Sequence, residues 1–190
     1  MNGEWCYFKS KISKDVCEHI IESASKLPKT DATIGHSENS ARLDELRKSK
    51  ISFIIKHDPN YKAIFNELWQ MALVANEDWF NFHITKLDFL QFAEYDSAYE
   101  GYYGKHHDVF WLNNDKKYHR KLSCIVQLSD PNNYEGGDFE LYADQMPNPI
   151  ELKEQGTVIF FPSFIEHQAK PVTKGTRYSL AGWFEGPKWR

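Results

Sequence analysis

Two histidines, one aspartate and one arginine are the residues of this chain whose types and spacing could do chemistry. His106 and Asp108 are two positions apart, so on a β-strand their side chains would point to the same side of the sheet. His167 could complete a set of two imidazoles and one carboxylate on one face of a metal ion. Such a set leaves positions open for substrate and gas, as oxygen chemistry at ferrous iron requires. Arg177 would offer a two-pronged donor to a dicarboxylate, so the pattern predicts a metal site beside an anion site.

Three neighbouring polar residues must be set apart from these candidates. Pleating puts His107 on the side of a strand away from Asp108, where a structural role is the simpler account. Glu166, next to His167, is expected to point away from the ligand face. His119 lies in the basic run 116–121 and is not expected to bind the metal. That run could be a solvated loop or could attract an acidic substrate.

The predicted ligands need a β-rich frame, and the sequence supplies one from about residue 83 onward. Short runs of β-type residues alternate there with turn residues. The eight candidate strands are 86–95, 101–111, 120–130, 136–143, 149–153, 156–163, 167–172 and 176–185. Their number and spacing predict an antiparallel jelly roll with helices packed outside it. We expect the adjacent Gly136 and Gly137 to form a tight turn with positive φ.

Residues 1–80 predict a helical or mixed N-terminal support for a β core spanning 83–186. Apolar residues recur at helical spacing after Ser13, a possible N-cap. They are Val16, Cys17, Ile20, Ile21, Ala24 and Leu27. A second helix is predicted at 61–75, and the polar segment 29–49 is predicted to be a loop. We interpret residues 1–190 as one domain, mainly β with flanking helices.

Composition and charge limit the classes of protein to which this chain could belong. A chain of 190 residues can bury one core without disulfide support. Cys6, Cys17 and Cys124 are widely spaced and suggest neither a disulfide framework nor a metal knuckle, which favours a reducing cytoplasm. We find no apolar leader run and no stretch approaching the roughly 18 apolar residues of a membrane span. The net charge of −4 argues against a broad nucleic-acid-binding surface.

Four motifs in order resemble the prolyl 4-hydroxylase branch of the Fe(II)/2-oxoglutarate-dependent dioxygenases. They are a tyrosine-containing run before H-x-D, the run LSCIVQLSD, the turn and strand YEGGDFELY, and FFPSFIEHQAKPVTKGTRYSLAGWF. The similarity covers residues 84–185. It implies a double-stranded β-helix, the cupin-like form of the jelly roll, with iron bound by His106, Asp108 and His167.

The resemblance also implies a pocket for 2-oxoglutarate. Arg177 would pair with the distal carboxylate of this cosubstrate. Tyr95 matches, with a one-residue insertion, a family tyrosine that reaches the same carboxylate. Gln127 lies where relatives carry another polar or aromatic pocket residue.

Three further residues complete the expected site. Ser179, two positions after Arg177 on the same strand face, could donate its hydroxyl to the same carboxylate. Tyr103 could support the metal site or simply pack. Trp183 matches a family tryptophan that lines the mouth of the pocket, although core packing is an equally good account.

The activity implied by the resemblance is hydroxylation of a C–H bond, with O2 consumed and 2-oxoglutarate converted to succinate and CO2. Ascorbate commonly serves this class as a reductant. The expected substrate is a proline in a peptide or protein, contacted by segments 29–49 and 109–121. One alternative is a nucleic-acid demethylase of the same superfamily, but that branch carries a second arginine where this chain has Trp183. Others are a zinc hydrolase with the same triad and an inactive jelly-roll binding module.

Overall fold

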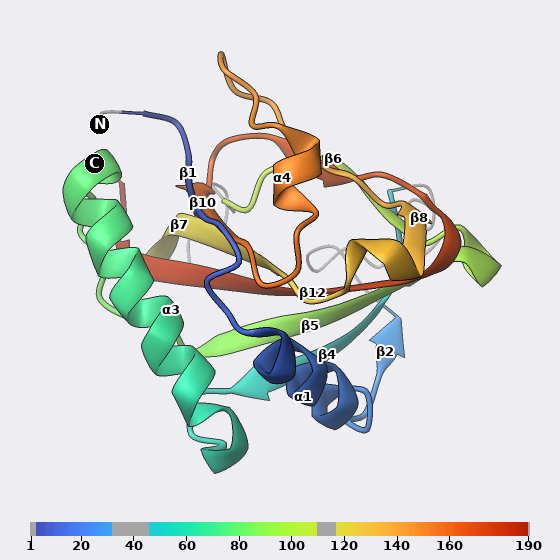
Figure 1. Ribbon diagram of the computed structural model, residues 1–190. Helices are drawn as coiled ribbons and strands as arrows, with labels where there is room; N and C mark the ends of the chain where they lie inside the picture. The colour runs from blue at the N-terminus through green and yellow to red at the C-terminus, as the bar shows by residue number, and fades with distance from the viewer. Residues whose placement is uncertain (1–2, 32–45, 110–116, 190) are drawn as a thin grey trace.

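Two antiparallel β-sheets form the frame of the protein (Figure 1). The computed structural model describes residues 3–31, 46–109 and 117–189. The larger sheet runs in the order β1-β10-β7-β12-β5-β4-β2, with β8 paired to β12. Its strands are β1 (Cys6–Phe8), β2 (Thr30–Asp31), β4 (Lys50–Ile55), β5 (Phe89–Asp96), β7 (Tyr118–Gln127), β8 (Tyr134–Gly136), β10 (Val158–Pro162) and β12 (Val172–Pro187).

The smaller sheet has the order β3-β6-β11-β9. Its strands are β3 (Arg47–Lys48), β6 (Tyr102–His106), β9 (Phe139–Leu141) and β11 (His167–Ala169). Together the two sheets confirm the predicted antiparallel jelly roll. The predicted Gly136-Gly137 turn is also confirmed, because both glycines have positive φ, 73° and 62°.

Two helices, α1 (Lys14–Ala24) and α3 (Lys62–Ala75), pack on the outer face of the larger sheet. In Figure 1, α1 lies below that sheet and α3 runs down its left side, whereas α4 (Pro149–Leu152) lies above the sheet. A π-helical turn (Asn76–Phe80) follows α3, and single 3-10 turns occupy Pro59–Tyr61, Ser97–Tyr99 and Pro131–Asn133. Ser13 caps α1 as predicted, since its hydroxyl accepts a hydrogen bond from the Val16 amide at 3.4 Å.

Strand β5 shows how the larger sheet separates the core from the site. Leu90 and Phe92 point outward and are buried in the main hydrophobic cluster with residues of α1 and α3. Residues of the opposite parity, Gln91, Ala93 and Tyr95, line a cavity on the inner face. This alternation follows from the pleat of the strand, so one strand serves both the core and the cavity.

Several elements differ from the sequence prediction. Segment 149–153 was predicted as a strand, but α4 forms there because Pro149 is suited to the first helical turn. The Asn148 side chain then caps it by accepting from the Ile150 amide. Strands β1 and β4 were not expected in the N-terminal part, and β2 and β3 lie at the two ends of segment 29–49, which was predicted to be a loop. In α1, Val16 is 38% exposed and so does not belong to the buried stripe.

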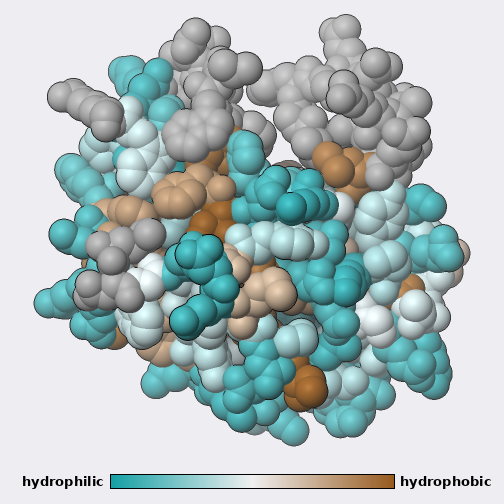
Figure 2. All heavy atoms as spheres, turned by 90° about the horizontal axis from the view of Figure 1, so that it is seen from above, coloured by the Kyte–Doolittle hydropathy of each residue, from teal (hydrophilic) through white to brown (hydrophobic). Residues whose placement is uncertain are grey.

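The outer surface is mostly hydrophilic on the face seen from above, with smaller apolar patches between the polar side chains (Figure 2). Within the described ranges, no helix is long and apolar enough to cross a membrane. The interpretation of the chain as a single domain stays a prediction.

Candidate metal centre and cosubstrate pocket

The pairing of β6 with β11 brings the two candidate histidines together. His106 is the last residue of β6 and His167 the first residue of β11, and they are direct partners in the antiparallel ladder. Directly opposite residues of such a ladder carry their side chains on the same face. The imidazole centroids are accordingly 4.3 Å apart.

Asp108 joins the histidines by a different route from the one predicted. The sequence prediction placed it on the same strand as His106, but β6 ends at His106 and Asp108 lies in a bend beyond it. Its backbone N–H donates to the carbonyl of Ser163 at 2.8 Å, which anchors the bend against the turn before β11. The carboxylate oxygens then lie 3.8 Å from His106 Nε2 and 3.6 Å from His167 Nε2.

These three residues offer one ligand atom each, all within 4.8 Å of one another, and they are the sole such cluster of metal-binding side chains in the described ranges. His107 and Glu166 are exposed, as expected for side chains that point away from this site. Glu166 pairs instead with Lys105 on the surface. His119 is not a member of this cluster.

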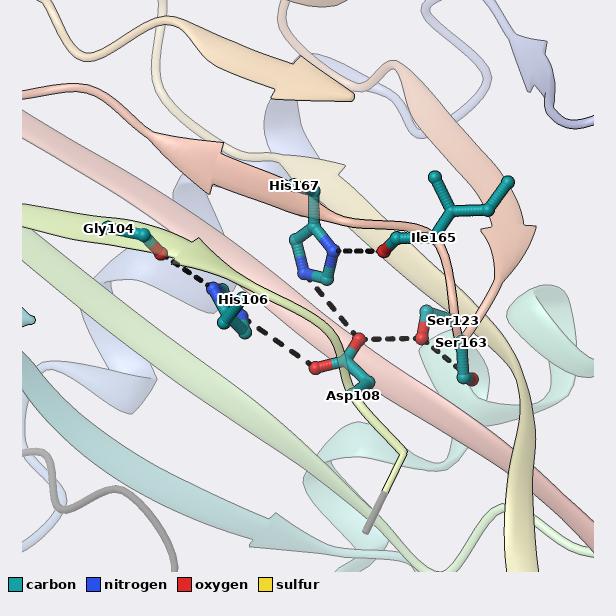
Figure 3. Close-up of polar contacts among 7 residues, drawn as sticks. All are labelled: Gly104, His106, Asp108, Ser123, Ser163, Ile165 and His167. Carbon is teal, nitrogen blue, oxygen red and sulfur yellow. Dashed lines mark hydrogen bonds and ion pairs between the residues drawn. The ribbon is translucent and has the colours of Figure 1, made fainter. Parts of the chain in front are cut away.

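A second layer of hydrogen bonds orients all three ligands (Figure 3). His106 Nδ1 donates to the Gly104 carbonyl at 2.8 Å, and His167 Nδ1 donates to the Ile165 carbonyl at 3.0 Å. The Nε2 lone pair of each ring is therefore directed toward Asp108 and is available to a metal. On its other side, Asp108 Oδ2 accepts from the Ser123 hydroxyl at 2.6 Å, and Ser123 in turn contacts Ser163 Oγ at 2.9 Å.

The electrostatics of the cluster suit a cation. Burial, followed by the nearby His167, lowers the pKa of His106 to about 3, so this ring is neutral at physiological pH. Burial disfavours the charge of Asp108, but His167 and Arg120 outweigh it, so the pKa of the carboxyl is lowered. Two imidazole lone pairs and an ionised carboxylate form a donor set for a divalent metal ion.

The rings of His106 and Tyr103 stack on each other, and the guanidinium of Arg47 lies against Tyr103. The Tyr103 ring lies parallel to the His106 ring, with centroids 3.5 Å apart and an angle of 11°. The Arg47 guanidinium carbon lies 4.1 Å from the centroid of the Tyr103 ring, and the two residues are paired across β3 and β6. Burial raises the pKa of Tyr103 to about 12, so the phenol stays neutral. Arg47 fell within the predicted loop 29–49, and no motif marked it.

The metal cluster opens into a cavity between the two sheets. The predicted residues Tyr95, Tyr103, Arg177 and Ser179 line this cavity together with the three candidate ligands. Its other lining residues are Gln91, Ala93, Ile125, Phe139, Ala169, Ala181 and Trp183. Gln91 was missed, although its even spacing from Tyr95 on a predicted strand could have placed it on the same face.

Arg177 is the cation of this cavity, and it is 3% exposed. Its Nε donates to Gln127 Oε1 at 3.0 Å, and the Tyr95 ring lies 5.5 Å from its guanidinium carbon. Among the residues that the structure describes, the Arg177 side chain has no ion pair and no hydrogen bond beyond that to Gln127. A buried guanidinium with only a neutral partner is suited to an anionic ligand, because burial of an uncompensated charge is costly.

Gln127 lies behind Arg177 and does not line the central cavity. It borders a small adjoining cavity with Arg177, Ile125 and Phe139. The structure thus brings Gln127 to the predicted anion site, in contact with the arginine.

An aromatic row extends from Trp183, which lines the cavity. Phe89 lies 5.7 Å from Trp183, and Phe53 lies 5.5 Å from Phe89, between ring centroids. The β7–β12 ladder shifts register beside Phe184, and Arg120 lies 3.8 Å from the centre of the Trp183 ring. A register shift of this kind re-aims a side chain. The two segments predicted to contact substrate are 29–49 and 109–121, and their residues 32–45 and 110–116 lie outside the described residues.

The basic run at 116–121 is only partly a solvated segment. Tyr118 begins strand β7, and Lys121 is 5% exposed, with its ammonium 3.5 Å from the centre of the Trp189 ring. Lys121 is therefore a packed residue and does not belong to a loop that attracts substrate.

Comparison with known proteins agrees with the metal site and the anion site described above. The family model described as the 2OG-Fe(II) oxygenase superfamily matches residues 90–185. Curated relatives include a PKHD-type hydroxylase of Prochlorococcus marinus, which is 31% identical over 147 residues, 77% of this chain and 59% of that protein. Another, from Aliarcobacter butzleri, is 32% identical over 97 residues, 50% of this chain and 42% of that protein. The chain thus spans less than two thirds of the length of these relatives.

Solved structures share the fold at low sequence identity. A prolyl-4-hydroxylase of Pseudomonas putida has a TM-score of 0.68 at 19% identity, covering 98% of this chain and 94% of that chain. A prolyl hydroxylase from Trichoplax adhaerens, in complex with a hypoxia inducible factor peptide fragment, has a TM-score of 0.73 at 16% identity. That match covers 96% of this chain and 83% of the other.

Proposed function

Because the chain belongs to the 2OG-Fe(II) oxygenase superfamily, we propose that it hydroxylates a C–H bond with Fe(II), O2 and 2-oxoglutarate bound in the cavity between its sheets. The family implies these three partners. The observation that carries the proposal is one cavity lined both by a histidine–aspartate–histidine cluster and by a buried arginine without a carboxylate partner in the described chain. These are the two anchors that a metal-chelating dicarboxylate needs.

His106, Asp108 and His167 would hold the iron. The donor set fits, because both rings present Nε2 while their Nδ1 atoms are used in backbone hydrogen bonds. Two imidazoles and one carboxylate on one face leave the remaining positions of the ion for the cosubstrate and O2. When bound, Fe(II) supplies the oxygen activation that converts 2-oxoglutarate to succinate and CO2 and hydroxylates the substrate.

Arg177 would bind the distal carboxylate of 2-oxoglutarate. Its Nη atoms can donate in a bidentate manner, which is the strongest form of this interaction. Ser179 and Tyr95 line the same cavity and would add hydroxyl donors. Apolar side chains such as Ile125 and Phe139 would keep water from the reacting atoms.

A prolyl residue of a peptide or protein is the substrate that we propose. The support is the printed names of similar proteins, which are PKHD-type hydroxylases and prolyl hydroxylases. The aromatic row that begins with Trp183 in the cavity lining is suited to packing on a pyrrolidine ring. The three cysteines are free and buried, in keeping with the proposed cytoplasmic location. Ascorbate is proposed as the reductant, and the acidic chain makes nucleic acid an unfavoured substrate.

The test is anaerobic loading with Fe(II), followed by addition of O2, 2-oxoglutarate and a library of proline-containing peptides. We expect succinate formation that depends on iron and 2-oxoglutarate, and a gain of one oxygen atom in a peptide, located by mass spectrometry. The His167→Ala variant is the matched negative control. Zinc-dependent hydrolysis without use of 2-oxoglutarate would instead favour the hydrolase alternative. Oxidation of methylated nucleic acid in place of peptide would favour the demethylase.

A further inference from the structure

The guanidinium of Arg177 is held by a neutral amide along one edge only. We infer that Gln127 is a positioning residue that aims Arg177 without neutralising it, and thereby makes the pocket selective for 2-oxo acids with a distal carboxylate. This inference rests on the proposed function. It concerns a chain of contacts behind the cavity, from Arg177 to Gln127 and on to Tyr134.

The orientation of the Gln127 amide is determined by three hydrogen bonds. Its Oε1 accepts from Arg177 Nε at 3.0 Å, while its Nε2 donates to the Ser129 carbonyl at 3.2 Å and to the Tyr134 hydroxyl at 2.9 Å. A flipped amide would place an N–H group against the Arg177 N–H and an oxygen against the Ser129 carbonyl. Gln127 is 3% exposed, so water could not readily compensate for those clashes.

The stem of Arg177 is held as well as its Nε. A Cβ atom at Gly137 would lie 3.0 Å from Arg177 Cδ and 3.3 Å from a ring carbon of Tyr134. The absence of a side chain at this position lets the arginine lie against the turn. With its stem packed and its Nε used by Gln127, the guanidinium can turn only its Nη edge to a ligand.

The charge of the partner is the second part of the inference. An amide satisfies the geometry of Arg177 Nε–H but leaves the positive charge uncompensated by any ion pair in the described chain. A glutamate at position 127 would have nearly the same shape and would accept the same hydrogen bond from Arg177, yet it would neutralise the cation. It would also lose the two hydrogen bonds that Nε2 donates to Ser129 and Tyr134, a loss that the neutral Gln127→Met variant shares. The neutral amide thus keeps the full attraction of the arginine for a second carboxylate of the ligand.

The experiment measures binding and needs no turnover. Wild type and Gln127→Glu, loaded with Fe(II) under anaerobic conditions, are titrated with 2-oxoglutarate and with 2-oxopentanoate by calorimetry. The second acid keeps the chelating end but has a methyl group in place of the distal carboxylate. We expect Gln127→Glu to raise the Kd of 2-oxoglutarate at least tenfold and to change that of 2-oxopentanoate less than twofold.

Two further variants separate positioning from a general effect on folding. Gln155→Glu is the matched control, because Gln155 is also buried and donates to a backbone carbonyl, that of Leu128 at 2.9 Å, but is not bonded to Arg177. It should leave the ratio of the two Kd values unchanged. Gln127→Met keeps the volume and neutrality, and it should weaken 2-oxoglutarate by a smaller factor than Gln127→Glu.

The ratio of the Kd of 2-oxoglutarate to the Kd of 2-oxopentanoate decides whether the inference holds. Equal losses for both acids in Gln127→Glu, or an unchanged Kd for 2-oxoglutarate, would overturn the inference. A ratio that moves as much in Gln155→Glu would also overturn it. If wild type binds neither acid, the proposed function itself fails, which is a different result from loss of selectivity in one variant.

Discussion

The hydroxyl of Ser123 should tune the affinity of the metal centre, although it cannot touch the metal. It donates to Asp108 Oδ2 at 2.6 Å, and both side chains are buried. A hydrogen bond to a charged group contributes about 1.5–3 kcal/mol, and each 1.4 kcal/mol corresponds to about tenfold in affinity. Ser123→Ala should therefore weaken metal binding by about 10- to 100-fold, the range typical of groups that orient metal ligands.

The measurement is a competition titration of Fe(II) between the protein and a chelating indicator under anaerobic conditions. Ser163→Ala, one hydrogen bond further away, should weaken binding by a smaller factor. Ser129→Ala is the matched control, because its buried hydroxyl accepts from the Tyr178 amide and has no contact with the cluster. An unchanged affinity in Ser123→Ala, or equal losses in all three variants, would refute this account of the network.

The other predictions concern the ligands, the anion site and pH. His167→Ala should abolish iron retention and cosubstrate turnover, measured by metal analysis and succinate release; iron-dependent turnover that survives would remove His167 from the metal site. Arg177→Met should raise the Kd of 2-oxoglutarate roughly 100-fold, as the loss of about 3 kcal/mol from a charge-assisted pair predicts, with Fe(II) affinity changed less than twofold. Asp96 accepts from the Thr176 hydroxyl and the Ala98 amide, which lower the pKa of its carboxyl below 3.8. The ionised form therefore stabilises the fold above pH 3.8, so Asp96→Asn should lower the free energy of unfolding by about 1 kcal/mol at pH 7. That difference should disappear as the pH falls through the lowered pKa, which urea unfolding at several pH values can measure.

The parts of the fold with a strong period could be predicted from the sequence. The spacing of the apolar residues in α3 predicted a helix, and the β-type residues of β5 predicted a strand. The structure has both elements. The strand predicted for segment 149–153 was wrong, because five residues are too few to show a clear hydrophobic period. There the cap by Asn148 and the proline at the first turn decided for a helix.

The candidate site could be predicted as a set of residues but not as a geometry. The spacing of His106 and Asp108 suggested one pleated strand, whereas the chain bends after His106 and the amide of Asp108 bonds to Ser163. That bond joins residues 55 positions apart, so no local sequence pattern predicts it. Arg47 and Ser123 were missed for the same reason, because their roles depend on partners brought near only by sheet pairing.

The lining of the cavity carries two opposite charges that are buried but not paired with each other. This arrangement is unfavourable for the stability of the fold. Asp108 and Arg177 are both buried, and the side chain of each is hydrogen-bonded to a neutral side chain: Asp108 accepts from Ser123, and Arg177 donates to Gln127. A sequence selected for stability alone would place apolar residues there or pair the two charges directly, since an isolated buried charge costs several kcal/mol. Hydroxyl and amide partners orient a charge without cancelling it. The charge of Asp108 thus stays available to a cation and that of Arg177 to a carboxylate, which is what a ligand bound to both ends of the cavity requires.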